Sequence, residues 1–379
     1  MKKKLKIPFK IVFIGIFLLM VASLGINKLV HTDYDTLDDM DKNMLKQLSQ
    51  VYETYNNESQ NIWKEGYTFN NIPLILTPVS KENGVMHTYS YAIGVDKLKN
   101  SLFSKKIEVP KEMNLPPIYR VSFMHPSLIK LWFPANFDFS DMGEQHVTLF
   151  KYNPVSVSEI SNERVFKYFL MHEVFHEYRQ VPIWENVNQL QSSIFVEERN
   201  KEQYQLLLTE FAILDKASST NNKDELINTL SDFITVRDAR YTKFPYMKQE
   251  KTVETLEGCA EYIEYKYSNL VGDSIKKQHK FSEAFNTKAL QNFTSKTTLN
   301  GFMDKDLYYY LGSLQGMFLD KLQVNWKDRV ENNELVYDIL RDEIGKQVSE
   351  NSKSLDAIKS EYGYNSFHEQ AEIIVNNFK

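Results

Sequence analysis

The spacing of apolar side chains changes character twice along this chain. Residues 11–26, IVFIGIFLLMVASLGI, form an uncharged run. Between residues 70 and 155, short runs rich in β-branched and aromatic residues are separated by proline, asparagine and glycine, which is the pattern of strands and turns. From residue 161 onward, apolar residues recur every three or four positions, as on the buried face of a helix. The pattern predicts an apolar segment, then a sheet, then helices.

The individual elements follow from these runs. Four strands are expected, at IPLILTPV (72–79), HTYSYAIGV (87–95), IYRVSFM (118–124) and HVTLFKY (146–152). A helix is expected before them, with an apolar face made of Met44, Leu45, Leu48, Val51 and Tyr52. Later helices are expected at 163–179, 201–217, 224–241, 252–271, 307–322, 334–348 and 366–378. A sheet followed by helices is an α+β order, so the expected fold is a mostly helical α+β protein with a small N-terminal sheet.

The first 32 residues are expected to direct the protein to a membrane. MKKKLKIPFK carries five lysines and no acid, and lysines beside an apolar span stay on the cytoplasmic side. The sixteen-residue apolar run is longer than most signal-peptide cores and slightly shorter than the roughly 20 residues of a membrane span. Residues 1–32 are therefore either a signal anchor, which gives a single-pass membrane protein, or a cleaved signal peptide, which gives a secreted one. Either way, the rest of the chain lies outside the cytoplasm.

Composition narrows the possible functions. The 24 Phe and 22 Tyr, against 13 Gly and 11 Pro, favour large side chains packed between helices over the tight turns of a barrel. Residues 1–28 hold six lysines and no acid, so the net charge falls from −5 to −11 without them, and no nucleic-acid partner is expected. Cys259 is the only cysteine, so it cannot form an intrachain disulfide and is expected to be a small buried hydrophobe. The composition is typical of an exported bacterial protein.

One helical segment carries a candidate metal site. The sequence MHEVFHEYR (171–179) places His172 and His176 four residues apart, so their imidazoles lie one turn apart on one helix face and can bind one cation. Glu173 can then reach a water at that cation. The neighbouring residues are mostly apolar, and histidines buried among them are costly without partners. Pro182 is expected to end this helix just after residue 180. Coincidence is the alternative explanation of the spacing.

A second helix offers the third ligand that a catalytic zinc site requires. In the segment 254–265, ETLEGCAEYIEY, four glutamates line one helix face, namely Glu254, Glu257, Glu261 and Glu264. On a protein surface this would be a solvated stripe. The intervening residues are mostly apolar or aromatic, so part of the stripe is expected to face inward. Gly258 indicates a close contact between two helices, which would bring Glu257 within reach of a metal on the motif helix.

HExxH followed by Glu-Gly-x-Ala-x-Tyr resembles the gluzincin zinc metallopeptidases, especially the branch related to membrane alanyl aminopeptidase. The resemblance implies a zincin-like helical catalytic region, with Glu257 as the third zinc ligand beside His172 and His176. It also implies that Glu261, four residues after that ligand, orients a zinc-bound histidine. The Tyr-x-x-Gly of this branch is matched within YYYLGS (308–313), where Tyr309 would stabilise the oxyanion.

The implied activity is hydrolysis of peptide bonds with one Zn²⁺ per chain. The metal would lower the pKa of a water and polarise the scissile carbonyl, and Glu173 would act as general base. Tyr308 and Tyr310 are rivals to Tyr309, and packing in a helical core is the alternative for all three. Two other functions stay open: a membrane-anchored zinc-binding or structural module without turnover, and a zinc hydrolase of non-peptide amides or esters. The expected partners are a peptide or protein substrate and the membrane.

Three segments are therefore expected. Residues 1–32 form the signal anchor or signal peptide, residues 33–155 a linker helix and the small sheet, and residues 156–379 the helical catalytic subdomain with the zinc site. By analogy with zincin folds, the strand at 146–152 would be the sheet edge that pairs with an extended substrate. Arg179, beside the motif, is expected to form a structural ion pair.

Overall fold

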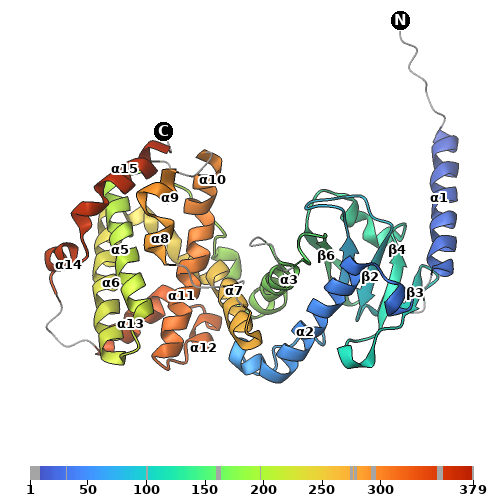
Figure 1. Ribbon diagram of the computed structural model, residues 1–379, viewed down its shortest axis with the longest axis horizontal. Helices are drawn as coiled ribbons and strands as arrows, with labels where there is room; N and C mark the ends of the chain where they lie inside the picture. The colour runs from blue at the N-terminus through green and yellow to red at the C-terminus, as the bar shows by residue number, and fades with distance from the viewer. Residues whose placement is uncertain are drawn as a thin grey trace, which may run out of the picture. The chain divides into compact units, whose positions relative to one another are not determined.

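The computed structural model describes residues 9–30, 32–99, 101–158, 164–196, 198–273, 276, 280–291, 296–347 and 353–377. Contacts divide the chain into two compact units, Met1–Val174 and Phe175–Lys379. All the described strands lie in the first unit beside long helices, whereas the described elements of the second unit are helices (Figure 1). This is the mostly helical α+β architecture that the sequence predicts. The domain boundary expected after residue 155 stays a prediction.

Six strands form one sheet in the described part of the first unit. They are β1 (Leu74–Pro78), β2 (Tyr89–Ile93), β3 (Ser104–Ile107), β4 (Ile118–Ser122), β5 (Phe137–Met142) and β6 (Gln145–Tyr152). Their order is β3-β4-β2-β1-β6-β5, and neighbours are antiparallel except β1 and β6, which are parallel. The four expected strands correspond to β1, β2, β4 and β6. The pattern does not predict β3 and β5, because their sequences SKKI and FDFSDM carry charges, which outer strands tolerate.

The strand at 146–152 is not a sheet edge. Within β6, Thr148 pairs with Leu74 of β1 on one side and with Phe139 of β5 on the other. Its backbone is therefore used within the sheet, and the prediction that an extended substrate pairs with it is wrong. The physical reason lies in the run HVTLFKY, whose last six residues are all buried. Burial on both faces is typical of an inner strand.

Helix α2 (Asp39–Ile62) is the expected helix before the sheet. Its predicted apolar face is buried, and its Asp41 side chain is buried with it. The hydroxyl groups of Tyr89, Tyr91 and Tyr152 donate to that carboxylate at 2.6, 2.6 and 2.5 Å. These bonds join α2 to β2 and β6 and offset the cost of burying a charge.

Helix α1 (Phe9–Leu29) contains the N-terminal apolar run and has 21 residues. Its residues 10–29 are long and apolar enough to cross a membrane. The helix is longer than the sixteen-residue run because Asn27 and Lys28, which interrupt the apolar pattern, are also helical.

The second unit is built from helices. After α4 (Val181–Ile183) these are α5 (Lys201–Ser219), α6 (Lys223–Lys243), α7 (Glu250–Val271), α8 (Phe281–Ala284), α9 (Thr287–Gln291), α10 (Lys296–Gly301), α11 (Leu307–Lys321), α12 (Trp326–Glu331), α13 (Val336–Gln347), α14 (Leu355–Glu361) and α15 (His368–Asn377). A π-helical turn, Phe302–Asp306, joins α10 to α11. Asn200 and Asn222 accept N–H bonds at the starts of α5 and α6, which fixes where these helices begin.

Two glycines allow α7 and α11 to pack with their backbones in contact. A Cβ on Gly312 would lie 1.9 Å from the carbonyl oxygen of Glu254, and one on Gly258 would lie 2.5 Å from Cα of Gly312. Gly258 therefore marks a close contact between helices, as the sequence predicts. The expected partner is wrong, because the helix that Gly258 meets is α11 and not the motif helix.

A fully buried ionic network ties α5, α6 and α7 together. Arg237 and Arg240 of α6 both donate to Glu210 of α5, through Nε atoms at 2.8 and 2.6 Å. Arg237 also donates to Glu254, and Arg240 to Glu250, both on α7. All five side chains are inaccessible to solvent. Removing one partner of such a network leaves a buried charge uncompensated, so the network fixes the relative positions of the three helices.

Candidate metal centre

The motif helix consists of α3 (Phe166–Phe175), a π-helical turn at His176–Gln180, and α4. In the π turn, Val181 donates its N–H to the carbonyl of His176, five residues earlier. The helix runs past Pro182 and ends at Ile183, so the expected stop after residue 180 is wrong. Pro182 has no N–H to continue the helical hydrogen bonds, and the helix ends one residue after it. Such π turns occur frequently at functional sites.

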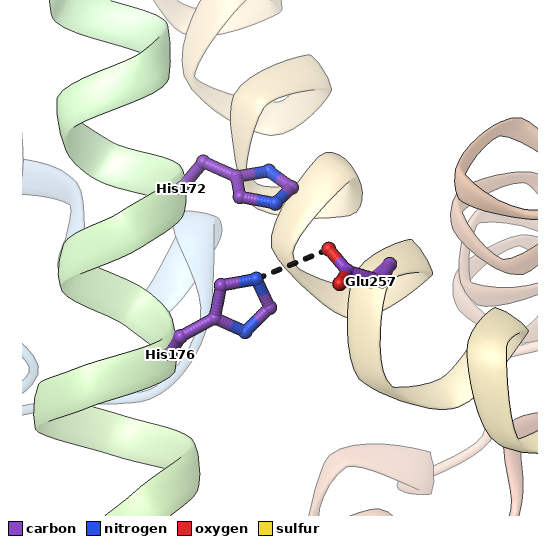
Figure 2. Close-up of side chains that lie close together, drawn as sticks. All are labelled: His172, His176 and Glu257. Atoms are coloured by element: carbon purple, nitrogen blue, oxygen red, sulfur yellow. Dashed lines mark hydrogen bonds and ion pairs between the residues drawn. The ribbon is translucent and has the colours of Figure 1, made fainter. Parts of the chain in front are cut away.

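The three expected ligands lie close together (Figure 2). Nε2 of His176 is 3.2 Å from Oε2 of Glu257, and one ligand atom each from His172, His176 and Glu257 lies within 4.8 Å of the other two. His172 lies one turn before His176 on the motif helix, whereas Glu257 lies on α7. Ligand atoms bonded to a tetrahedral zinc at about 2.1 Å are separated by about 3.4 Å, so the His176–Glu257 spacing fits that geometry.

Gln180 orients His176, and sequence analysis does not identify it. Its side chain is fully buried, and its Nε2 donates to the carbonyl oxygen of Leu256 at 2.7 Å. The amide oxygen therefore faces the ring of His176, where it accepts a hydrogen bond from Nδ1. Leu256 directly precedes Glu257, so one side chain connects the second histidine to the backbone beside the third ligand. The available signal was a glutamine four residues after His176, on the same helix face.

This hydrogen bond decides what the other ring nitrogen can do. With the proton of a neutral His176 on Nδ1, the Nε2 atom carries a lone pair. That lone pair faces Oε2 of Glu257 at 3.2 Å, and both atoms are electron-rich. Such a contact is favourable when a proton or a cation lies between the two atoms. Two neutral imidazoles and a carboxylate are a donor set that zinc binds.

A second group of side chains surrounds His172. Its ring lies with the carboxylates of Glu261 and Glu264, with one ligand atom of each within 4.8 Å of the other two. Lys276 donates to both carboxylates, at 3.0 Å to Glu261 and 2.7 Å to Glu264. Burial alone would lower the pKa of Lys276, but these two carboxylates raise it well above its usual value. Glu261 therefore lies near His172, and the orienting role implied for it stays a prediction.

The four glutamates of the predicted stripe have three different environments. Glu254 belongs to the ionic network, Glu257 faces His176, and Glu261 and Glu264 share Lys276. All four are at most 5% exposed. The whole stripe therefore faces inward, which agrees with the prediction that at least part of it does.

The candidate catalytic groups differ in accessibility. Glu173 is half-buried on the motif helix, next to His172. Tyr308 is buried and donates to Glu250 at 3.0 Å, so its hydroxyl group is used in the helix core. Tyr310 lines an apolar cavity of about 140 Å³ together with Tyr265. Tyr309 is partly exposed, and Lys305 lies over its ring.

Two further expectations concern residues beside the ligands. Arg179 donates to Glu331 of α12 at 2.7 Å, which is the structural ion pair predicted for it. Cys259 is buried and not disulfide-bonded, and burial raises the pKa of its thiol, so it packs as a small hydrophobe as predicted. Both residues support the helices that carry the ligands.

Comparison with known protein families, curated proteins and solved structures finds no match to this chain.

Proposed function

We propose that this chain is an extracytoplasmic zinc-dependent metallopeptidase, held at a membrane by α1, that hydrolyses peptide bonds. The observation that carries the proposal is the convergence of His172, His176 and Glu257, with Nε2 of His176 facing the carboxylate and Gln180 on the other ring nitrogen. Three protein ligands with a further position for water are typical of catalytic zinc, whereas structural zinc is usually bound by four protein ligands. The half-buried Glu173 also supports catalysis, because a structural site needs no base.

The residues of the site have complementary roles in amide hydrolysis. Zinc held by the three ligands would supply Lewis acidity, lowering the pKa of a water and polarising the substrate carbonyl. Glu173 accepts the proton of the attacking water and then delivers it to the leaving amine. Tyr309 donates its hydroxyl to the developing oxyanion, and the loss of one such donor typically costs about 100- to 1000-fold in rate. Gln180 and Glu261 hold the two histidines in place.

The first test is the metal content of the purified protein. Elemental analysis should find about one zinc per chain, and Glu257→Ala should lower this content sharply because only two ligands remain. His146→Ala is a matched control, since His146 is exposed on β6 and belongs to neither ligand group. A parent protein that holds no zinc even after reloading would overturn the proposal.

The second test separates metal binding from catalysis. Glu173→Gln keeps the size of the side chain but removes its basicity, so zinc content should persist while cleavage of casein or a peptide library falls by about 100- to 10,000-fold. Undiminished hydrolysis by this variant would show that Glu173 is not the base. Zinc binding by a parent protein that cleaves no peptide would instead favour a structural zinc module or a hydrolase of other amides and esters.

A further inference from the structure

Exposed apolar side chains gather at one end of the sheet. Outside α1, the large apolar side chains of the first unit that are exposed among the described residues are Val85, Met86, Leu102, Ile129, Trp132, Phe133 and Val155. They belong to four segments: 79–88 between β1 and β2, 101–103 before β3, 123–136 between β4 and β5, and 153–158 after β6. Scattered single apolar residues need no explanation, but a gathering of this kind marks an interaction surface.

The strand register shows that these four segments share one end. Tyr89, at the start of β2, pairs with Ser122, the last residue of β4. Ser104, at the start of β3, pairs with Val121 near the end of β4. The ends of β1 and β6 pair with each other through Pro78 and Tyr152. The start of β5 pairs with Phe150, two residues from the end of β6. The segments at the opposite end, 94–95, 108–117 and 143–144, contain none of the exposed apolar residues.

Helix α1 packs beside β3 and β4, and its N-terminal part points toward the same end (Figure 1). Asn27 accepts a hydrogen bond from Arg120 of β4 at 2.6 Å, and Ser23 is hydrogen-bonded to Ser122 at the end of that strand. Moving from Asn27 back to Ser23 along α1 therefore follows β4 forward from Arg120 to its last residue, Ser122. The part of α1 before Ser23 continues beyond the end of the sheet, and most of its apolar side chains are exposed.

The length of α1 relates this end of the sheet to the bilayer. A membrane span needs roughly 20 helical residues. Because α1 has 21 residues, nearly all of it, almost to Leu29, is needed to cross the bilayer. Ser23 lies six residues before Leu29, which corresponds to about 9 Å along a helix axis. The loops beside Ser23 therefore reach a depth of about 5–10 Å, where apolar side chains of membrane-surface elements are normally buried. Tryptophan, as at position 132, is enriched at this level.

We infer that one end of the sheet, formed by segments 79–88, 101–103, 123–136 and 153–158 and called the membrane-facing end, inserts its exposed apolar side chains into the interface of the lipid bilayer that α1 crosses. The partner is the lipid itself, at the boundary between headgroups and acyl chains. α1 is then one part of a two-part attachment, in which the hydrogen bonds of Ser23 and Asn27 fix the sheet against the helix. The inference rests on the proposal that α1 crosses a membrane and is independent of the proposed peptidase activity.

Tryptophan fluorescence tests this inference directly. The chain has four tryptophans, of which Trp132 is 41% exposed while Trp63, Trp184 and Trp326 are at most 2% exposed. The full chain is reconstituted in phosphatidylcholine and phosphatidylglycerol nanodiscs, with or without bromine on the acyl chains. Brominated lipid should quench part of the emission of the parent protein, and Trp132→Phe should abolish that quenching. Equal emission of the parent in both lipids would overturn the inference.

A relocated tryptophan provides the matched control. Glu112 is exposed in the segment between β3 and β4, at the opposite end of the sheet. In the Trp132→Phe background, the tryptophan introduced by Glu112→Trp should not be quenched by brominated lipid. Quenching there as strong as at position 132 would contradict a defined membrane-facing end. Replacing Phe133 by Asp should weaken the quenching of Trp132 while the circular dichroism spectrum stays unchanged.

Discussion

Gln180 holds the imidazole of His176 in place without contacting a metal itself. Its amide donates to the backbone of α7 and accepts from Nδ1 of His176, so it fixes both the tautomer and the rotation of the ring. Side chains that orient metal-binding histidines in this way typically change metal affinity by about 10- to 100-fold when removed.

Replacing Gln180 by Ala should therefore lower zinc affinity by about 10- to 100-fold, because His176 loses the acceptor that keeps Nε2 available. Competition against a zinc-chelating dye measures this affinity. Gln189→Ala is the control, since Gln189 lies in a short 3₁₀ turn outside the site. Unchanged affinity in Gln180→Ala, with a folded protein by circular dichroism, would refute its orienting role.

At the residue scale, the sequence identifies the candidate ligands but not their support. The spacing of His172 and His176 fixes their common helix face, and the resemblance supplies Glu257. Gln180 and Lys276 depend on contacts with α7 that no local pattern encodes. Among the three tyrosines, the contact of Tyr308 with Glu250 becomes visible only once the helices are packed.

At the element scale, the contact between α7 and α11 depends on the absence of side chains at two positions. Gly258 predicts a close approach of two helices because glycine in a helix has a cost in stability. The sequence does not say which helix approaches, since that depends on the matching Gly312 some fifty residues later. In the same way, the sequence pattern does not predict β3 and β5, because outer strands need no continuous apolar run.

Gly312→Ala should destabilise the second unit by about 3 kcal/mol, at the upper end of overpacking effects, because the added Cβ meets backbone that cannot rotate away. Urea unfolding followed by circular dichroism measures the change. Gly345→Ala in α13 is a matched control, since a Cβ there meets nothing within 4 Å. It should be neutral or stabilising by up to about 1 kcal/mol. Equal stability of the two variants would show that α7 and α11 can separate at little cost.

At the scale of the whole molecule, the order of apolar segment, sheet and helices is predicted correctly, because each has its own hydrophobic period. The ionic network that joins α5, α6 and α7 is not predicted. Its charged residues are spread over three helices, and charged residues in a sequence normally indicate positions that face solvent. The candidate metal centre adds a further link between the motif helix and α7. Zinc binding is therefore expected to stabilise the fold as well as to supply chemistry.

Removing the metal should lower the stability of the whole protein. A ligand present at 1000 times its Kd stabilises the native state by about 4 kcal/mol, and chelation removes that contribution. Scanning calorimetry with and without EDTA measures the shift in Tm. Glu257→Ala should give the same Tm with and without chelator. A parent protein indifferent to EDTA and to added zinc would show that no metal links these helices.

The π turn at His176–Gln180 makes the centre sensitive to the number of residues in the motif helix. A π turn is equivalent to one extra residue inserted into an α-helix. Deleting one residue between 177 and 179 would remove the extra residue and restore regular α-helical spacing, so the residues beyond the turn would keep their helix faces. Gln180 would then lie three residues after His176 instead of four, which moves its amide oxygen relative to Nδ1 of the ring while every ligand keeps its identity. The extra residue in the turn therefore sets the position from which Gln180 reaches His176.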